Sequence, residues 1–294
     1  MDRVLRDKKA ICVFILPALI LFTVIAVLPI FFSGYYGMLE WDGIGQGTFV
    51  GFKNYINLFV DNDVFIKAIK NSFILAGLSV FIQLPIALLF ALILAYGVKG
   101  ENFYRTVYFI PVIISTVVIG QLWMKIYNPS YGLLNTFLRS IGLESAARAW
   151  LGTAETSLMS AFVPIVWQYV GYHMLLMYAA AKSIPGEIYE AARIDGASHM
   201  KTSLSITIPL MQPIIKVCVT FAVIGSLKSF DLIYILTNGG PVHSSEVPGT
   251  LMFNTIFHKF MYGNGSAMAV FIIVECLVLT VIIQRLFKVE QITY

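Results

Sequence analysis

Six long runs of apolar residues alternate with short polar segments along the chain. Each run is close to the roughly 20 residues that an α-helix needs to cross the apolar core of a bilayer. Backbone groups in lipid must be paired within their own segment, and no barrel-type alternation is present, so these runs predict helices. Pro85 predicts a kink in the second run, and Pro111 lies near the start of the third. The predicted membrane-spanning helices cover residues 10–33, 71–98, 106–124, 156–181, 214–236 and 266–287.

Composition supports integration into a membrane. The chain has 294 residues, of which 58% are hydrophobic and only 12% are charged, about half the usual charged share. A soluble protein of this length could not bury so much apolar surface. The net charge of +4 carries no nucleic-acid signature, and Cys12, Cys218 and Cys276 all fall in apolar runs without disulfide or metal-ligand spacing. The first run lacks a small-residue cleavage site, so we expect a retained helix.

The distribution of positive charge predicts the orientation of the helices. Lys and Arg in short loops mark the cytoplasmic side of a membrane protein. Here 12 of the 20 basic residues gather on one side, which places both termini and the loop over 184–209 in the cytoplasm of the cell. These residues are Arg3, Arg6, Lys8, Lys9, Lys99, Arg105, Lys182, Arg193, Lys201, Lys216, Arg285 and Lys288.

The segment from Ile184 to Pro209 mixes charge with helical signals between two apolar runs. Pro185 suits a first helical turn, and Glu187 suits the positive end of the helix dipole. Gly196 can end this helix, and Ser198 can cap a second short helix that Pro209 and Pro213 would end. The pattern predicts a helix-turn-helix at the membrane surface. One of its sides carries small residues, so that the backbone of a partner can approach closely. An ordinary polar loop is the alternative.

The same segment carries a family resemblance. Glu190-Ala191-Ala192, followed by Gly196 and by Ile206-Thr207-Ile208-Pro209, resembles the EAA loop of permease subunits in bacterial ABC importers. Ile208 stands where that family usually has Leu. Segments 49–59, 105–111 and 230–241 are similar to the same family, so the resemblance covers nearly the whole chain. Its nearest type is the first of the two permeases in maltose-type carbohydrate uptake.

This resemblance implies a fold and a domain plan. We expect an all-α polytopic protein with six transmembrane helices, which is the type I ABC importer permease fold, with the EAA loop as a cytoplasmic coupling helix. Residues 1–294 would form a single permease domain. Its core would cover about 67–288, its peripheral first helix about 10–33 and its EAA loop about 183–213.

The resemblance also implies partners and a division of labour. The complex would contain a second, homologous permease, two ATPase subunits and an extracytoplasmic sugar-binding protein in the bacterial inner membrane. ATP and Mg²⁺ would bind the ATPase subunits, and this chain contains no Gly-Lys dipeptide of a phosphate-binding loop. The chain itself would have no catalytic residue, cofactor or metal site. The expected ATPase-coupling residues are Glu187, Glu190, Ala191, Ala192, Arg193, Asp195, Gly196, Ala197 and Pro209.

Polar residues within the apolar runs are candidates for cargo binding, because they are costly in lipid. Lys228 and Asp231, three residues apart, could pair on one helix face or contact cargo. The lone His173 is either a satisfied structural residue or a ligand, and Glu275 would pair with a neighbouring helix. Aromatic faces beside polar groups suit sugars, which adds Tyr169 to the candidates. The predicted substrate-binding residues are Trp167, Tyr172, His173, Ser226, Lys228, Ser229 and Asp231, and the outer turn Asn238, Gly239, Gly240 and Pro241 is assigned to the binding protein.

Three other functions compete with carbohydrate import. An ion-coupled carrier needs intramembrane carboxylates as relays, and only Asp231 and Glu275 qualify. An intramembrane enzyme needs a catalytic constellation, and no such spacing occurs. An ABC permease for another polar solute, such as glycerol phosphate, stays open as an alternative.

Overall fold

The computed structural model describes residues 8–287, which fall into two compact units. One unit contains the described residues up to Asp63 together with Met252–Val274. The other contains Val64–Leu251 and the described residues from Glu275 onward. The two chain termini, for which a cytoplasmic location is predicted, lie outside the described residues.

The smaller unit is built from helices and one short hairpin. Its strands pair antiparallel, with Leu39 opposite Phe49 and Glu40 opposite Thr48. The side chain of Asn54 donates to the carbonyl oxygens of Gly37 and Leu39 and so holds the hairpin to the following helix. The elements are α1 Lys8–Phe22, η2 Thr23–Val27, α2 Leu28–Tyr36, β1 Leu39–Glu40, β2 Thr48–Phe49 and α3 Lys53–Val60, with parts of α15 Pro248–Phe257 and α16 Tyr262–Leu286.

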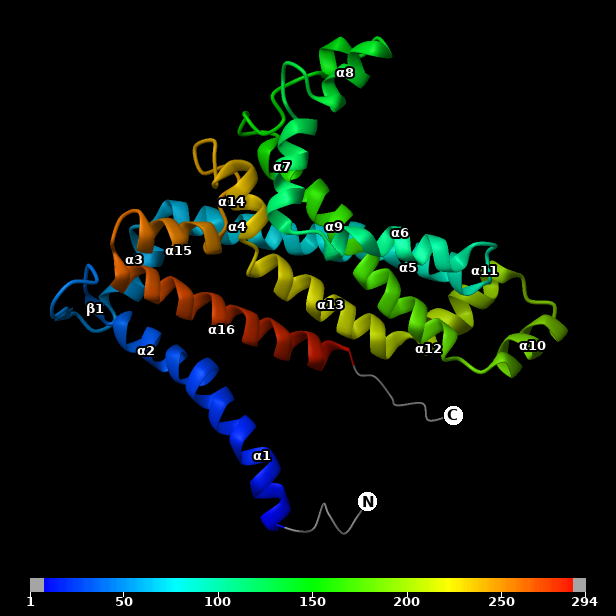
Figure 1. Ribbon diagram of the computed structural model, residues 1–294, viewed down its shortest axis with the longest axis horizontal. Coiled ribbons are helices and arrows are strands. Elements are labelled where there is room, and N and C mark those ends of the chain that lie inside the picture. The colour runs from blue at the N-terminus through cyan, green and yellow to red at the C-terminus, as the bar shows by residue number, and fades with distance from the viewer. Residues whose placement is uncertain (1–7, 288–294) are drawn as a thin grey trace. The chain divides into compact units, whose positions relative to one another are not determined.

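The larger unit is organised around one helix, α9. This helix, Ser157–Lys182, packs against α5, α6, α13 and α14 (Figure 1). Its residues Met174 and Met177 are fully buried in the main apolar cluster. The other elements are α4 Asp63–Leu78, η3 Ser79–Gln83, α5 Leu84–Ala95, α6 Glu101–Ile113, α7 Thr116–Ile126, α8 Leu133–Ser140, η4 Glu144–Ala146, α10 Gly186–Ile194, α11 His199–Thr202, η5 Ser203–Thr207, α12 Ile208–Leu210, α13 Gln212–Leu227 and α14 Asp231–Thr237.

Three helices within residues 8–287 are long and apolar enough to cross a membrane, namely Cys12–Tyr36, Asp63–Ala95 and Tyr262–Leu286. Two bent helix pairs raise this number to five if each pair counts as one span. Helix α9 has 26 residues, which is long enough to span, but Gln168, His173 and its tyrosines lower its hydropathy. The all-helical class is confirmed, and the count of six spans stays a prediction.

Proline residues widen the helices at three places. The π-helical stretches η2, η3 and η5 are each followed within two residues by a proline: Pro29, Pro85 and Pro209. Proline has no N–H, and its ring collides with the carbonyl four residues earlier, which in each case lies inside the π-helical stretch. Widening the turn relieves this collision. The predicted kink at Pro85 therefore takes the form of a widened turn.

Two of the predicted spans are not continuous helices, and that part of the prediction is wrong. The run over 106–124 is broken at Ile114 and Ser115, where the backbone is extended and the helices bend by 96°. The run over 214–236 is broken between Leu227 and Asp231. Hydropathy averaged over a whole run does not register such breaks, because most residues of the run are apolar.

The second short helix ends at Leu210, between Pro209 and Pro213, as predicted. The helical run His199–Leu210 passes through Pro209, because η5 has already made room for its ring. The bend of 73° follows at Met211, and Pro213 lies in the first turn of α13. Proline is tolerated in a first turn, where its missing N–H has no intrahelical partner.

Candidate functional site

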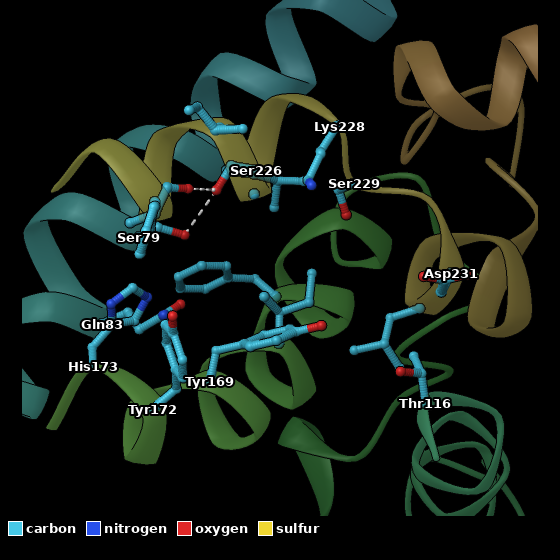
Figure 2. Close-up of a pocket in the computed structure, with 18 of the residues that line it drawn as sticks. Ser79, Gln83, Thr116, Tyr169, Tyr172, His173, Ser226, Lys228, Ser229 and Asp231 are labelled. Atoms are coloured by element: carbon cyan, nitrogen blue, oxygen red, sulfur yellow. Dashed lines mark hydrogen bonds between the residues drawn. The ribbon is translucent and has the colours of Figure 1, made fainter. Parts of the chain in front are cut away.

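A cavity of about 470 Å³ lies within the larger unit. It is bounded by α4 with η3, by the break between α6 and α7, by α9, and by the break between α13 and α14. Aromatic side chains and small hydroxyl groups make up much of its wall (Figure 2). The lining residues are Leu75, Ser79, Gln83, Val112, Thr116, Phe162, Ile165, Tyr169, Tyr172, His173, Phe221, Ala222, Ile224, Gly225, Ser226, Lys228, Ser229, Phe230, Asp231 and Leu232.

Helix α9 supplies one continuous wall of the cavity. Its lining residues recur at intervals of three and four, which places them on one face of an α-helix. This face runs from Phe162 through Ile165 and Tyr169 to Tyr172 and His173. The opposite faces of α9 meet the apolar core, so the cavity wall is held in place by packing.

Four polar residues gather at one end of the cavity, where Figure 2 shows Ser79, Gln83, His173 and Ser226 together. The Ser226 hydroxyl donates to the carbonyl of Ala222, at 2.9 Å, and the two serine Oγ atoms are 3.0 Å apart, so Ser79 is the donor between them. Gln83 is 2% exposed and His173 is 4% exposed. Gln83 Oε1 and His173 Nδ1 have no hydrogen-bond partner among the described residues.

The charged residues of the cavity lie at the break in the fifth predicted span, away from Gln83 and His173. Lys228 is the C-cap residue of α13, and Asp231 begins α14. The two residues therefore do not share one continuous helix face, contrary to the prediction. Within residues 8–287 no ion pair joins them. Both side chains are exposed and line the cavity with Ser229.

The structure brings six of the seven predicted substrate-binding residues into this cavity. The seventh, Trp167, does not line it; its ring instead makes an edge contact with Trp123, with centroids 6.1 Å apart. Glu275 does not line the cavity either. It is buried, and neither carboxylate oxygen has a hydrogen-bond partner in the described part of the chain, so the predicted pairing with a neighbouring helix is absent there. Side chains of His, Cys, Asp and Glu within 8–287 form no group that could hold a metal ion.

The inner loop contains the predicted helix-turn-helix. Helix α10 ends with Gly196 at φ +72°, and two hydrogen bonds close its C-terminus: Ala197 N donates to Ala192 O and Gly196 N to Arg193 O. This is the Schellman arrangement, which favours glycine at the left-handed position. Ser198 then caps α11 by accepting from Lys201 N, as predicted.

Helix α10 has one face against the bundle and one face free. Ile188 and Tyr189 pack on the main apolar cluster, and Ala192 is buried. Ile194 is 88% exposed, which is unusual for such an apolar residue in a polar segment. Among the predicted coupling residues, Ala192 is thus buried and Ala197 is half-buried, whereas the exposed ones are Glu187, Glu190, Ala191, Arg193, Asp195, Gly196 and Pro209.

Specific contacts tie this loop to neighbouring helices. The Tyr96 hydroxyl donates to His199 O at 2.9 Å and lies 2.6 Å from Ser203 Oγ, which links the end of α5 to α11. At the end of α9, Tyr178 donates to the Glu101 carboxylate, which also pairs with Lys182 at 3.3 Å. The Tyr96 contacts therefore fix α11 to the end of α5, and the Glu101 contacts fix the end of α9, where the loop begins, to α6, while the outer face of α10 stays exposed.

The outer turn after α14 surrounds a buried carboxylate. Glu246 is 1% exposed; it pairs with His243 Nδ1 at 2.6 Å and accepts from Thr250 Oγ1 at 2.6 Å. Asn71 donates to the carbonyls of Ser244 and Glu246. A Cβ atom at Gly239 would collide with the Glu246 carboxylate. Of the predicted binding-protein residues, Asn238 is exposed, Gly239 is buried, and Gly240 and Pro241 are half-buried.

Sequence reasoning missed several cavity residues, above all Ser79, Gln83 and Thr116. A signal was present for Gln83, which is a polar residue inside the predicted span 71–98. Polar residues in membrane helices usually face a partner or a cavity. The contribution of Thr116 could not be seen in this way, because it depends on the sharp break between α6 and α7.

Comparisons with known proteins agree with this architecture. The family described as "Binding-protein-dependent transport system inner membrane component" matches residues 83–289. The "Probable ABC transporter permease protein YurN" of Bacillus subtilis is 38% identical over 96% of this chain and 97% of its own length. The "Diacetylchitobiose uptake system permease protein NgcF" of Streptomyces coelicolor is 32% identical over 94% of this chain and 80% of its own. A crystal structure of a bacterial alginate ABC transporter, in complex with an alginate pentasaccharide-bound periplasmic protein, contains a chain that is 26% identical with a TM-score of 0.84, covering 98% of both chains.

Proposed function

The chain belongs to the family of binding-protein-dependent transport system inner membrane components, and we propose that it is the permease subunit of an ATP-driven carbohydrate importer. Its cargo would pass from an extracytoplasmic binding protein through the cavity described above into the cytoplasm. The named functions of relatives support a sugar as cargo, because one is a diacetylchitobiose permease and a structural neighbour imports alginate. The aromatic wall beside hydroxyl, amide and imidazole groups suits a sugar ring, which has apolar faces and polar edges.

One observation carries this proposal: helix α9 joins the cavity to the inner loop. Its residues from Phe162 to His173 line the cavity, and its last residue, Lys182, lies four positions before α10 begins. The helix is well packed along its length, so movement of α10 is transmitted to the cavity wall. A partner that pulls on the loop thereby changes the shape of the cavity.

The break at 228–230 gives the cavity a second moving wall. Discontinuous helices commonly form the cargo sites of transporters, because their free backbone ends and polar residues face a cavity. Here α13 lies between the bend at Met211, next to the inner loop, and the break that holds Lys228 and Ser229. Movement of the inner loop would therefore reach the cavity through both α9 and α13.

The proposed complex has a second permease, two ATPase subunits and a binding protein. We place α10 in a groove of an ATPase subunit, with Glu190 and Arg193 as charged contacts and Ile194 as the apolar one. ATP and Mg²⁺ would bind those subunits and close them around nucleotide. In this proposed complex both termini and the inner loop would lie on the cytoplasmic side of the cell membrane.

The outer turn over 238–247 is the proposed contact with the binding protein. Val242 at its tip is 84% exposed, and Asn238, Val242 and His243 all have positive φ values. Such conformations are rare for a β-branched residue and persist only where surrounding contacts hold them. The bonds of Asn71 and Thr250 to this segment provide those contacts.

Uptake by the reconstituted complex tests the proposal. The full chain is purified with the subunits that accompany it, placed in proteoliposomes, and supplied with labelled maltose, trehalose, diacetylchitobiose or glycerol 3-phosphate. We expect uptake of a sugar. This uptake should require ATP on the side of the membrane that carries the ATPase subunits, and it should require the binding protein on the opposite side. An ionophore that collapses ion gradients should have no effect.

Two outcomes would contradict the proposal in different ways. Uptake driven by a proton or sodium gradient without ATP would replace the pump by an ion-coupled carrier. ATP-dependent uptake of glycerol 3-phosphate but of no sugar would keep the pump and change its cargo.

A further inference from the structure

Two buried polar atoms at one end of the cavity have no partner in the described part of the chain. They are Oε1 of Gln83, at the end of η3, and Nδ1 of His173, on α9. Figure 2 shows both side chains at the same end of the cavity. Native proteins rarely leave buried polar atoms unpaired, because each one loses its hydrogen bonds to water. An unpaired atom beside a cavity therefore points to a partner that enters the cavity.

The two neighbouring serines sharpen this observation. Ser79 and Ser226 lie at the same end but are bonded to each other and to Ala222. Both hydroxyl hydrogens are already donated, so these serines can only accept from a ligand, whereas Gln83 Oε1 and His173 Nδ1 have no hydrogen bond at all among the described residues. The amide oxygen of glutamine can only accept, and a neutral imidazole nitrogen accepts or donates according to its tautomer. A hydroxyl group satisfies both, because it donates and accepts.

Charge separates this end from the other. Of the charged residues that line the cavity, Asp231 lies at the opposite end in Figure 2, and Lys228 lies between Asp231 and Ser226. An acidic group of the cargo would find no cation beside Gln83 and would face an amide oxygen instead. The end at Gln83 and His173 is thus suited to the uncharged, hydroxyl-bearing part of a cargo molecule.

We propose that Gln83 and His173 are specificity-determining residues that form hydrogen bonds with hydroxyl groups on an uncharged sugar ring. Gln83 Oε1 would accept, and His173 Nδ1 would accept or donate according to its tautomer. This inference rests on the proposed function as a carbohydrate permease. A site built to bond a hydroxyl discriminates strongly against an analogue that lacks it, because the polar groups of the site are then left unpaired. The two residues therefore control which sugar is carried more than how fast the pump turns.

The test compares a sugar with its deoxy analogues in the reconstituted complex. The parent sugar is whichever of maltose, trehalose and diacetylchitobiose the wild-type complex takes up, and each analogue has one hydroxyl replaced by hydrogen. The measured quantity is the ratio of kcat/KM for the parent to kcat/KM for each analogue. Wild type and variants use the same binding protein, so its own discrimination cancels when their ratios are compared.

The variants are Gln83→Leu and His173→Phe, which remove the polar atoms and keep most of the volume. For at least one analogue we expect a ratio of about tenfold or more in wild type. We expect this ratio to fall about tenfold in Gln83→Leu, to the value that the binding protein sets by its own discrimination, because the parent loses a bond that the analogue never makes. His173→Phe should act in the same way, and it tests the proposal even if Gln83→Leu fails to assemble.

Gln168→Leu is the matched control. Gln168 is also buried on α9, and its Oε1 also lacks a partner among the described residues. It does not line the cavity; its Nε2 donates to one lining residue, Thr116, at 3.2 Å, on the side away from Gln83 and His173 in Figure 2. Its substitution should leave the ratios unchanged. Unchanged ratios for every analogue in both cavity variants, with uptake of the parent intact, would overturn the inference. Absence of any sugar uptake by wild type would overturn the proposed function and this inference with it.

Discussion

The inner loop and the outer turn each contain a glycine with positive φ, and the two glycines differ in what surrounds them. Gly196 in the inner loop has φ +72° and open space where a Cβ atom would lie. Gly239 in the outer turn has φ +80°, and a Cβ atom there would meet the carboxylate of Glu246. The inner turn is therefore held by its own helix caps, whereas the outer turn is held by tertiary contacts.

This difference indicates that the inner turn is constrained by binding to a partner, whereas the outer turn is constrained by the stability of the fold. A surface turn that nothing in the described chain covers is free to change without harm to the fold, so constraints on it come from binding. A turn packed around a buried carboxylate is constrained by stability itself. Substitutions at the two glycines should consequently fail in different assays.

The largest effect is expected from Gly196→Asp, which should abolish uptake. Aspartate is one of the few side chains that tolerate the left-handed region, and the space around Gly196 is open, so the fold should survive. A negative charge would instead enter the proposed ATPase contact. Uptake by proteoliposomes and the amount of folded protein in the membrane measure the two effects. Normal uptake would contradict the docking of this loop on an ATPase.

The next effect is on stability and distinguishes the two turns directly. Gly239→Ala should lower the free energy of unfolding by about 2–4 kcal/mol, because it adds overpacking to left-handed strain. Gly196→Ala is the matched control and should cost about 1 kcal/mol, from strain alone. Thermal unfolding of the purified proteins in detergent compares them. If the two substitutions lowered the free energy of unfolding equally, the difference in packing around the two glycines would not contribute to stability.

Removal of Asn71 should have an intermediate effect on the outer turn. Asn71→Ala leaves the buried carbonyls of Ser244 and Glu246 without this donor, and the expected loss is about 1–3 kcal/mol of stability. The same unfolding measurement applies, with protection of the amide hydrogens over 238–250 against exchange as a local readout. Unchanged protection in this segment would mean that Asn71 does not hold the turn.

The smallest effect is expected at the cap of the second short helix. Ser198→Ala removes the side-chain acceptor for Lys201 N and should cost about 1 kcal/mol, because this cap is exposed. Ser198→Asp restores an acceptor and is the control. Hydrogen exchange over residues 199–202 reports the local loss. Wild-type exchange in Ser198→Ala would assign the stability of α11 to its bonds with Tyr96 instead.

The inner loop could be read from the sequence because its signals are local. The end of α10 at Gly196 and the cap at Ser198 each involve residues within five positions of one another. The outer turn could not be read in this way. Its backbone carbonyls at Ser244 and Glu246 accept from Asn71, more than 170 positions away in the chain, and no local pattern records that contact.

The cavity lies between these two cases. Six of its polar and aromatic residues were predicted from their position inside apolar runs, but the prediction treated each run as a straight helix. The break at Ser115 brings Thr116 to the cavity wall. The break at Lys228 separates Lys228 from Asp231. Trp167 faced away, because its position on α9 falls outside the face that runs from Phe162 to His173.

By itself, the sequence determined that this chain is a helical membrane protein with a capped helix-turn-helix between two apolar segments. These features follow from composition and from interactions within one or two helical turns. Tertiary structure alone decided where helices break, which polar residues meet at the cavity, and why Gly239 admits no side chain. Those outcomes depend on packing between segments far apart in the chain. Such a contact contributes to stability only after both segments have folded and come together.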